Sequence, residues 1–237
     1  TRPAFGATAV VPGEGIVITF SEWIDPASAQ RAVSIYPPLN GPMRISVRGR
    51  RLLVSSRRPL RDSTTYHLLV SDALRDLHRV QLDDPVNLIF STGPSLDSGS
   101  LRGCIATMPR LRLPTAALFT CEEPFSDTTL FEVPSYCAQA DTSGLFSFDF
   151  VRRGSYRLIA FVDKNYDGRF QPGDETLFLP RSKIVRIGED TSRVTLYGAT
   201  ADTNALRCNR IVARAPGILT GSLNRPSFVD AMHLRAA

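Results

Sequence analysis

Residues 156–180 read YRLIAFVDKNYDGRFQPGDETLFLP, and two consecutive patterns in this stretch decide the fold of the region. From Tyr156 to Val162 the side chains alternate with a period of two, which is typical of a β-strand and not of a helix. The strand runs directly into Asp163, Asn165 and Asp167, which place three oxygen-bearing side chains at every second position before a glycine. The stretch therefore predicts a strand that ends in a tight loop rich in oxygen ligands.

The loop has the spacing of a site that wraps a hard cation such as Ca²⁺, because alternate side chains point inward and the glycine allows a sharp turn. The predicted ligands all offer oxygen atoms, and they are Asp163, Asn165, Asp167, Arg169 through its carbonyl, Asp174 and Glu175. The alternative is a metal-free turn in which the Asp and Asn side chains bond their own backbone. An aspartate in place of the usual glutamate at the twelfth position predicts weak binding, with a dissociation constant of about 10⁻⁴–10⁻³ M.

The composition is that of an ordinary globular chain, since 43% of the 237 residues are hydrophobic and 22% are charged. No apolar run approaches the roughly 20 residues that cross a bilayer. The chain begins at Thr1 without a leader, which we interpret as a processed or excised part of an exported protein. The arginine-rich run at residues 48–61 lacks interleaved aromatic residues, so we expect a solvated hairpin face and no nucleic-acid partner.

The cysteines indicate the redox compartment. They lie far apart, at Cys104, Cys121, Cys137 and Cys208, with no C-x-x-C pair and only three histidines in the chain, which makes a zinc site improbable. An even number at wide spacing favours two disulfides in an oxidising compartment. Three connectivities are open, and we favour Cys121–Cys137 with Cys104–Cys208, because the first pair would close a short excursion between neighbouring strands.

Short strands at regular spacing over the first 93 residues are typical of an all-β sandwich. Four blocks in this part resemble, in order and spacing, the bacterial Ig-like domain of S-layer and surface proteins: ITFSEWID at 18–25, YPP at 36–38, LRDSTTY at 60–66 and FSTG at 90–93. One departure is the sequence DLHR at 76–79, where that family often has a small Gly/Asn turn. The resemblance implies an Ig-like β-sandwich over residues 1–94.

A polar DSGS linker at 97–100 precedes a second set of strand patterns. Its blocks LRG at 101–103, DTSGLFSF at 141–148 and GSYRLIAFVD at 154–163 resemble the transthyretin-like sandwiches of carboxypeptidase regulatory domains and collagen-adhesin B-type repeats. Because B-type repeats carry similar acidic loops, the resemblance also implies calcium. We therefore predict an all-β chain of two tandem Ig-like/transthyretin-like sandwiches, over 1–94 and 95–200, with a C-terminal extension over 201–237. We expect this extension either to pack against the second sandwich or to add a strand to a neighbouring copy.

Catalytic motifs are absent from the sequence. His67, His78 and His233 lie outside any nucleophile–base setting, and we expect His67 to be exposed on the strand face opposite Tyr66. We therefore predict an exported, non-catalytic structural or adhesive module of a bacterial cell surface or extracellular assembly, with proteins or copies of itself as partners.

Two alternatives stay open. One is an accessory region of an exported hydrolase. The other is a carbohydrate-binding surface lipoprotein, whose platform would be built from aromatic side chains: Trp23, Phe125, Phe131 and Tyr136.

Overall fold

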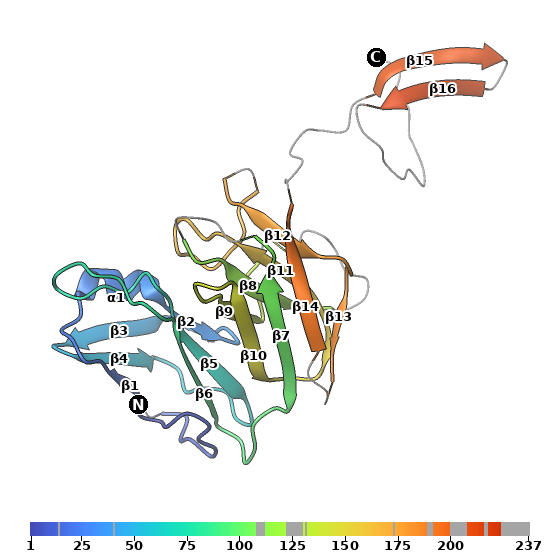
Figure 1. Cartoon of the computed structure of the whole chain (residues 1–237). Helices are drawn as coiled ribbons and strands as arrows, with labels where there is room; N and C mark the ends of the chain where they lie inside the picture. The colour runs from blue at the N-terminus through green and yellow to red at the C-terminus, as the bar shows by residue number, and fades with distance from the viewer. Residues whose placement is uncertain are drawn as a thin grey trace. The chain divides into compact units, whose positions relative to one another are not determined.

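The computed structural model describes residues 1–13, 15–39, 41–107, 112–121, 130, 132–172, 174–188, 192–199, 208–215 and 218–223. The chain divides into two compact units, Thr1–Ala201 and Asp202–Ala237. Almost every described element is a β-strand, so the all-β prediction is confirmed (Figure 1). No helix in these ranges has the length and apolar character needed to cross a membrane.

The first part of the larger unit is a sandwich of two three-stranded sheets. One sheet has the order β1-β4-β3, with strands β1 (Ile16–Thr19), β3 (Met43–Arg48) and β4 (Arg51–Ser56). The other has the order β2-β5-β6, with strands β2 (Val33–Tyr36), β5 (Thr65–Val70) and β6 (Val86–Ser91). All neighbouring strands are antiparallel, and residues such as Ile18, Leu52, Leu68 and Leu88 fill the space between the sheets.

A short helix, α1 (Pro26–Ala32), covers one open edge of this sandwich. Asp25 caps it by accepting hydrogen bonds from the backbone N–H groups of Ala27 and Ser28, both at 3.1 Å, and Pro26 needs no partner at the first helical position. The amide of Gln30 donates to the carbonyl of Ile45 in β3 at 2.9 Å. The helix therefore blocks pairing along this part of the β3 edge.

The N-terminal residues 2–10, which we call the N-terminal strap, cover the edges of both sheets. Arg2 exchanges two backbone hydrogen bonds with Val17 of β1, at 2.8 and 2.7 Å. Further along, the Gly6 N–H donates to Ile89 of β6 at 2.8 Å, and Ala7 accepts from Ser91 at 2.8 Å. The pairing with β1 is antiparallel and that with β6 is parallel.

The second part of the larger unit, which we call the second sandwich after its sequence-based prediction, is one eight-stranded sheet that curls around its own core. The strand order is β10-β7-β14-β12-β11-β8-β9, and β13 pairs with β11 beside β12. The strands are β7 (Gly99–Ile105), β8 (Thr115–Thr120), β9 (Tyr136–Gln139), β10 (Leu145–Val151), β11 (Gly154–Phe161), β12 (Leu177–Pro180), β13 (Val185–Ile187) and β14 (Ser192–Ala199). The two ends of the order, β9 and β10, lie next to each other, so the sheet nearly closes (Figure 1). The pairing of β14 with β7 is parallel and the other pairs are antiparallel.

Each part has its own hydrophobic core, and some apolar or aromatic side chains of one part pack into or against the core of the other. Tyr36 and Leu69, from the first sandwich, belong to the core of the second, while Tyr166 of the acidic loop packs against the first core. The smaller C-terminal unit contains one antiparallel hairpin, β15 (Cys208–Ala215) and β16 (Ile218–Leu223).

Candidate functional site

The interface between the two sandwiches is centred on β5, which is buried on both faces along its whole length. Tyr66, Leu68 and Val70 point into the first core. Because successive residues of a strand face opposite sides, His67 and Leu69 point the other way, toward the second sandwich. The site is therefore a contact between two folded parts, and it places a histidine inside the molecule.

His67 is fully buried, with 0% of its surface exposed, so the expectation of an exposed histidine is wrong. Its Nε2–H donates to the carbonyl of Phe150 at 3.2 Å, and its ring meets that of Tyr136 edge-on at 5.0 Å. Burial lowers the pKa of His67 from 6.5 to about 4. The ring is therefore neutral at neutral pH, and its Nδ1 has no hydrogen-bond partner among the described atoms.

A β-bulge in β10 supplies the acceptor for this histidine. The register of β10 against β7 shifts between Asp149 and Val151, and Phe150 takes a positive φ of 59°. A bulge leaves one residue outside the ladder, which frees its carbonyl for another partner. Phe5 of the strap packs against the ring of Phe150 at 6.2 Å, so the strap reaches the same contact.

Two further polar contacts join the sandwiches. The side chain of Gln139 in β9 donates to Asp72 Oδ1 at 2.7 Å and accepts from the Asp72 N–H at 2.9 Å. The Tyr36 hydroxyl forms a hydrogen bond with the Cys137 thiol, and both side chains are buried. Burial raises the pKa of Cys137 to about 12, so this thiol stays protonated and unreactive at neutral pH.

The acidic loop lies against this interface, and its carboxylates accept hydrogen bonds from its own backbone. Asp163 accepts from the N–H of Tyr166 at 2.6 Å and from that of Gly168 at 2.8 Å. Asn165 and Asp167 bond the backbone two residues ahead, at 3.1 and 2.9 Å. Both Tyr166 and Gly168 have a positive φ, of 61° and 71°, so the sharp turn expected near the glycine is present.

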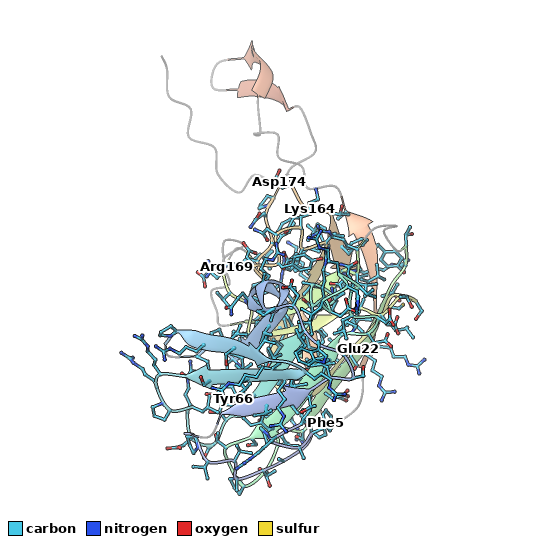
Figure 2. All side chains as sticks on the ribbon, turned by 90° about the vertical axis from the view of Figure 1, so that its left-hand side faces the viewer. Phe5, Glu22, Tyr66, Lys164, Arg169 and Asp174 are labelled. Atoms are coloured by element: carbon cyan, nitrogen blue, oxygen red, sulfur yellow. The ribbon has the colours of Figure 1, made fainter. Side chains whose placement is uncertain are left out.

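Glu175, rather than the side chain of Asp174, closes the loop. Its two carboxylate oxygens accept from the N–H groups of Lys164 at 2.9 Å and Gln171 at 3.0 Å. Lys164 reaches back to the carbonyl of Asp174, and Figure 2 shows these two residues close together. Burial raises the pKa of both Asp163 and Glu175.

The loop geometry is that of the metal-free turn, and it is compatible with a cation. Within the described ranges, no group of three or more His, Cys, Asp or Glu side chains gathers to hold a metal ion. A carboxylate oxygen has two lone pairs, however, so an oxygen that accepts one N–H can also face a cation. Calcium binding by Asp163, Asn165 and Asp167, with the Arg169 carbonyl, stays a prediction.

The predicted disulfide between Cys121 and Cys137 is wrong, because Cys137 is a free thiol. Cys137 lies opposite Ala117 in the β8–β9 ladder, whereas Cys121 follows β8 four residues further along. Four strand residues span about 13 Å, and a disulfide needs Cα atoms within about 7 Å. Cys104 is also a free thiol, 3.5 Å from the Thr195 hydroxyl. Because Cys104 is a free thiol, the predicted Cys104–Cys208 bond is not formed in this structure either. The side chain of Cys208 itself lies outside the described residues.

The residues predicted to form the aromatic platform lie in different parts of the molecule. Trp23 is 60% exposed on the first sandwich, whereas Tyr136 is buried at the interface, with 7% of its surface exposed. The two therefore do not form one aromatic platform, and Phe125 and Phe131 lie outside the described residues. The arginines of the β3–β4 hairpin are exposed to solvent as expected.

This interface was not predicted from the sequence, although the residues of β5 carry one signal for it. In the segment TYHLLV at 65–70, Leu69 places an apolar side chain on the face opposite Tyr66, Leu68 and Val70, and a strand with apolar side chains on both faces is expected to be covered on both. The fold and the interface together define an all-β module in which two hydrophobic cores belong to one compact unit.

Comparisons with known proteins identify the first sandwich. Residues 1–92 match the family described as a bacterial Ig-like domain. The match and the two-sheet architecture of this part support the Ig-like prediction. No curated protein matches the chain at a significant level.

Solved structures similar to the chain include a bacterial pilin subunit and a bacterial S-layer protein. The major pilin subunit BcpA of Bacillus cereus is 10% identical, with a TM-score of 0.28, and the match covers 79% of this chain and 58% of the pilin. The N-terminal part of the bacterial S-layer protein SbsC is 14% identical, with a TM-score of 0.28 over 80% of this chain and 42% of that one. The Bacillus anthracis TIE protein is 13% identical, with a TM-score of 0.22 over 83% of this chain and 40% of that one. TM-scores this low do not establish a shared fold over the whole chain.

Proposed function

We propose that the chain is a non-catalytic structural or adhesive module of a bacterial cell surface or extracellular assembly, in which the two sandwiches act as one rigid body. The observation that carries the proposal is the interface itself, where buried polar groups of one sandwich are bonded to the other. Domains of one chain are expected to move relative to each other unless their interface is large and apolar, and here Tyr36 and Leu69 of the first sandwich also belong to the core of the second. The bacterial Ig-like match over residues 1–92 supports a surface role.

The reactive side chains at the interface are held in inert forms, which supports a structural role. The His67 ring is neutral and covered, and the Cys137 thiol is protonated and bonded to Tyr36. A general base must reach a substrate proton, and a nucleophilic cysteine must ionise. Neither side chain meets these conditions.

We further propose that the second sandwich is transthyretin-like and that its acidic loop binds Ca²⁺ weakly. The resemblance of residues 141–148 and 154–163 supports the first statement. For the second, Asp163, Asn165 and Asp167 would hold the ion, with a carboxylate from Asp174 or Glu175. A bound cation would neutralise Asp163 and Glu175, whose carboxylates are buried.

Two experiments test the proposal. In intact cells of the source organism, the protein should be degraded by an externally added protease and recognised by antibodies without lysis. Detection only after lysis would overturn the surface assignment.

The rigid-body statement is tested by small-angle X-ray scattering of the purified chain. Gln139→Ala, which removes the Asp72 contact, should broaden the distribution of interatomic distances. Gln30→Ala, which removes an exposed glutamine bond inside the first sandwich, is the matched control and should leave it unchanged. Equal scattering from both variants would contradict the rigid-body interpretation.

A further inference from the structure

The single tryptophan of the chain, Trp23, lies on the surface at one end of the first sandwich, in the segment between β1 and α1. Backbone hydrogen bonds hold this segment from both sides. The Ile24 N–H donates to the carbonyl of Gly49 in the β3–β4 turn at 3.1 Å, and the Leu77 N–H donates to the carbonyl of Trp23 at 3.0 Å. The fold therefore fixes the position of an exposed aromatic residue.

The ring of Trp23 has one covered face and one free face. A Cβ built on Gly49 would lie 3.8–3.9 Å from three successive atoms of the six-membered ring, Cε3, Cζ3 and Cη2. A point at equal distances from three ring atoms lies over the face of the ring and not beyond its edge, so this face rests on Gly49. Because 60% of the side chain is exposed, the opposite face is open to solvent.

A groove of about 200 Å³ opens beside this ring, and we call it the Trp23 groove. Its charged lining residues have a formal charge of −2 (three carboxylates less one guanidinium), and they are Glu22, Asp76, Asp83 and Arg75. Glu22 and Asp83 are exposed, and within the part of the chain that the structure describes neither has a hydrogen bond or an ion pair. The chain as a whole has a net charge of +5, so the groove reverses the overall sign and favours a cation.

The combination of a free tryptophan face and carboxylates is suited to a guanidinium group. A guanidinium is planar, so it stacks on an aromatic face, and it donates to a carboxylate through two parallel bonds. A nucleic acid or an acidic polysaccharide would be repelled by the carboxylates. The Trp23 groove is therefore best matched by an arginine side chain.

Exposed arginines without a partner lie on the outer face of the sheet β1-β4-β3, whose strands are side by side in Figure 1. Arg44 and Arg48 of β3 are four residues apart and share one face, and Arg51 of β4 lies opposite Arg48 in the ladder. Among the described residues, none of these three exposed side chains has a hydrogen bond, an ion pair or a ring contact. The three strands contain no Asp or Glu. Like charges directly opposite on neighbouring strands repel each other, so this arginine face would be stabilised by an acidic partner.

We infer that the Trp23 groove of one copy receives an arginine from the arginine face of a second copy of this chain. Charge complementarity supports this occupant, because every copy carries a groove of charge −2 and an arginine face of charge +3 (three arginines). Among the described residues no cation lies over the Trp23 ring, so the contact is left for another copy. The inference rests on the proposed structural role and names the surfaces through which copies meet.

The test combines sedimentation velocity of the intact chain at about 1–500 μM with the fluorescence of Trp23, the only tryptophan. We expect self-association that strengthens at low ionic strength, with a change in tryptophan emission as the concentration rises. Trp23→Ala and the arginine-face variant Arg48→Glu/Arg51→Glu should each raise the dissociation constant about tenfold or more, because a stacked and charge-assisted contact is lost. A wild-type chain that stays monomeric over this range would overturn the inference.

Mixing the two variants tests the pairing of the two surfaces directly. The Trp23→Ala chain keeps its arginine face, and the arginine-face variant keeps its groove, so the mixture should associate although neither variant does so alone. All tryptophan emission in the mixture comes from the arginine-face variant, and it should change on mixing. A mixture that stays monomeric, or a variant that associates alone as tightly as the wild type, would contradict the inference.

A matched control separates the arginine face from overall charge. Arg102→Glu/Arg186→Glu changes two exposed arginines of the second sandwich, and like the arginine-face variant it lowers the net charge from +5 to +1 (two changes of −2 each). It should alter the dissociation constant less than about threefold; equal losses in both double variants would count against the inference. Glu22→Gln/Asp83→Asn is a second groove variant that keeps the tryptophan, and it should also weaken association. The protease experiment on intact cells tests the surface assignment separately, so self-association of a chain that is not exposed on cells would overturn that assignment and support this inference.

Discussion

Acidification should weaken the fold through one residue, His67. Its ring is fully buried between the sandwiches, and burial lowers its pKa from 6.5 to about 4. In the unfolded chain the ring returns to a pKa of about 6.5. Between pH 6.5 and pH 4 the unfolded state therefore binds a proton that the folded state does not, and the free energy of unfolding falls as the pH falls.

The size of the effect follows from the two pKa values. The stabilisation from a neutral His67 is fully present above pH 6.5 and is lost progressively on acidification through this window. The lowering of the pKa from 6.5 to about 4 corresponds to about 3 kcal/mol of folding stability, of which about 2–3 kcal/mol is lost by pH 4.5. Asp163 and Glu175 act in the opposite direction, because their raised pKa values make the folded state bind protons more readily.

The assay is urea denaturation at pH 7 and pH 4.5 of the wild type and of His67→Gln, which cannot be protonated. Comparing the two chains cancels the contribution of the carboxylates. The wild type should lose about 2–3 kcal/mol more than the variant between the two pH values. His78→Gln is the matched control, because the side chain of His78 is 84% exposed, and it should behave like the wild type. Equal losses in the wild type and His67→Gln would refute the reasoning.

Three further predictions follow from single contacts. Gln139→Ala removes both hydrogen bonds to the first sandwich and should lower the free energy of unfolding by about 1–3 kcal/mol in urea denaturation; an unchanged midpoint would contradict this. Calcium at about 10 mM should stabilise the wild type by about 1–3 kcal/mol in thermal melting, and Asp163→Asn should remove this stabilisation. Identical melting temperatures with calcium and with a chelator would show that the loop is a metal-free turn. Gly103→Ala should cost about 1–3 kcal/mol, because a Cβ there would lie 2.1 Å from the Phe146 ring, while Gly198→Ala, whose nearest neighbour lies at 3.9 Å, should be much milder.

Local structure was largely readable from the sequence. The alternation from Tyr156 to Val162 predicted a strand, and the structure has β11 there. The helix α1 likewise begins where Asp25 precedes a proline, which is a local N-cap signal. These features depend on residues close together in the chain, and such residues determine hydrogen bonding and turn geometry directly.

Contacts between distant segments were not readable in the same way. The sequence places His67 on the face opposite Tyr66, but it does not say that another sandwich covers this face. The disulfide prediction failed for a similar reason, because spacing along the chain does not give the register of β8 against β9. The acidic loop combines both cases. Its turn was predicted from neighbouring residues, whereas its closure by Glu175 depends on how the chain returns to Lys164.

The N-terminal strap has a consequence for how the chain carries load. The strap runs parallel to β6, and β6 leads onward to the second sandwich. A tensile force applied between the N-terminus and residue 93 would therefore pull the two strands lengthwise past each other. The hydrogen bonds at Gly6, Ala7 and Val10 lie across this direction and would have to break together, not one after another. Such shear geometry resists extension more strongly than a hairpin that opens from one end, so the strap acts as the clamp of the first sandwich.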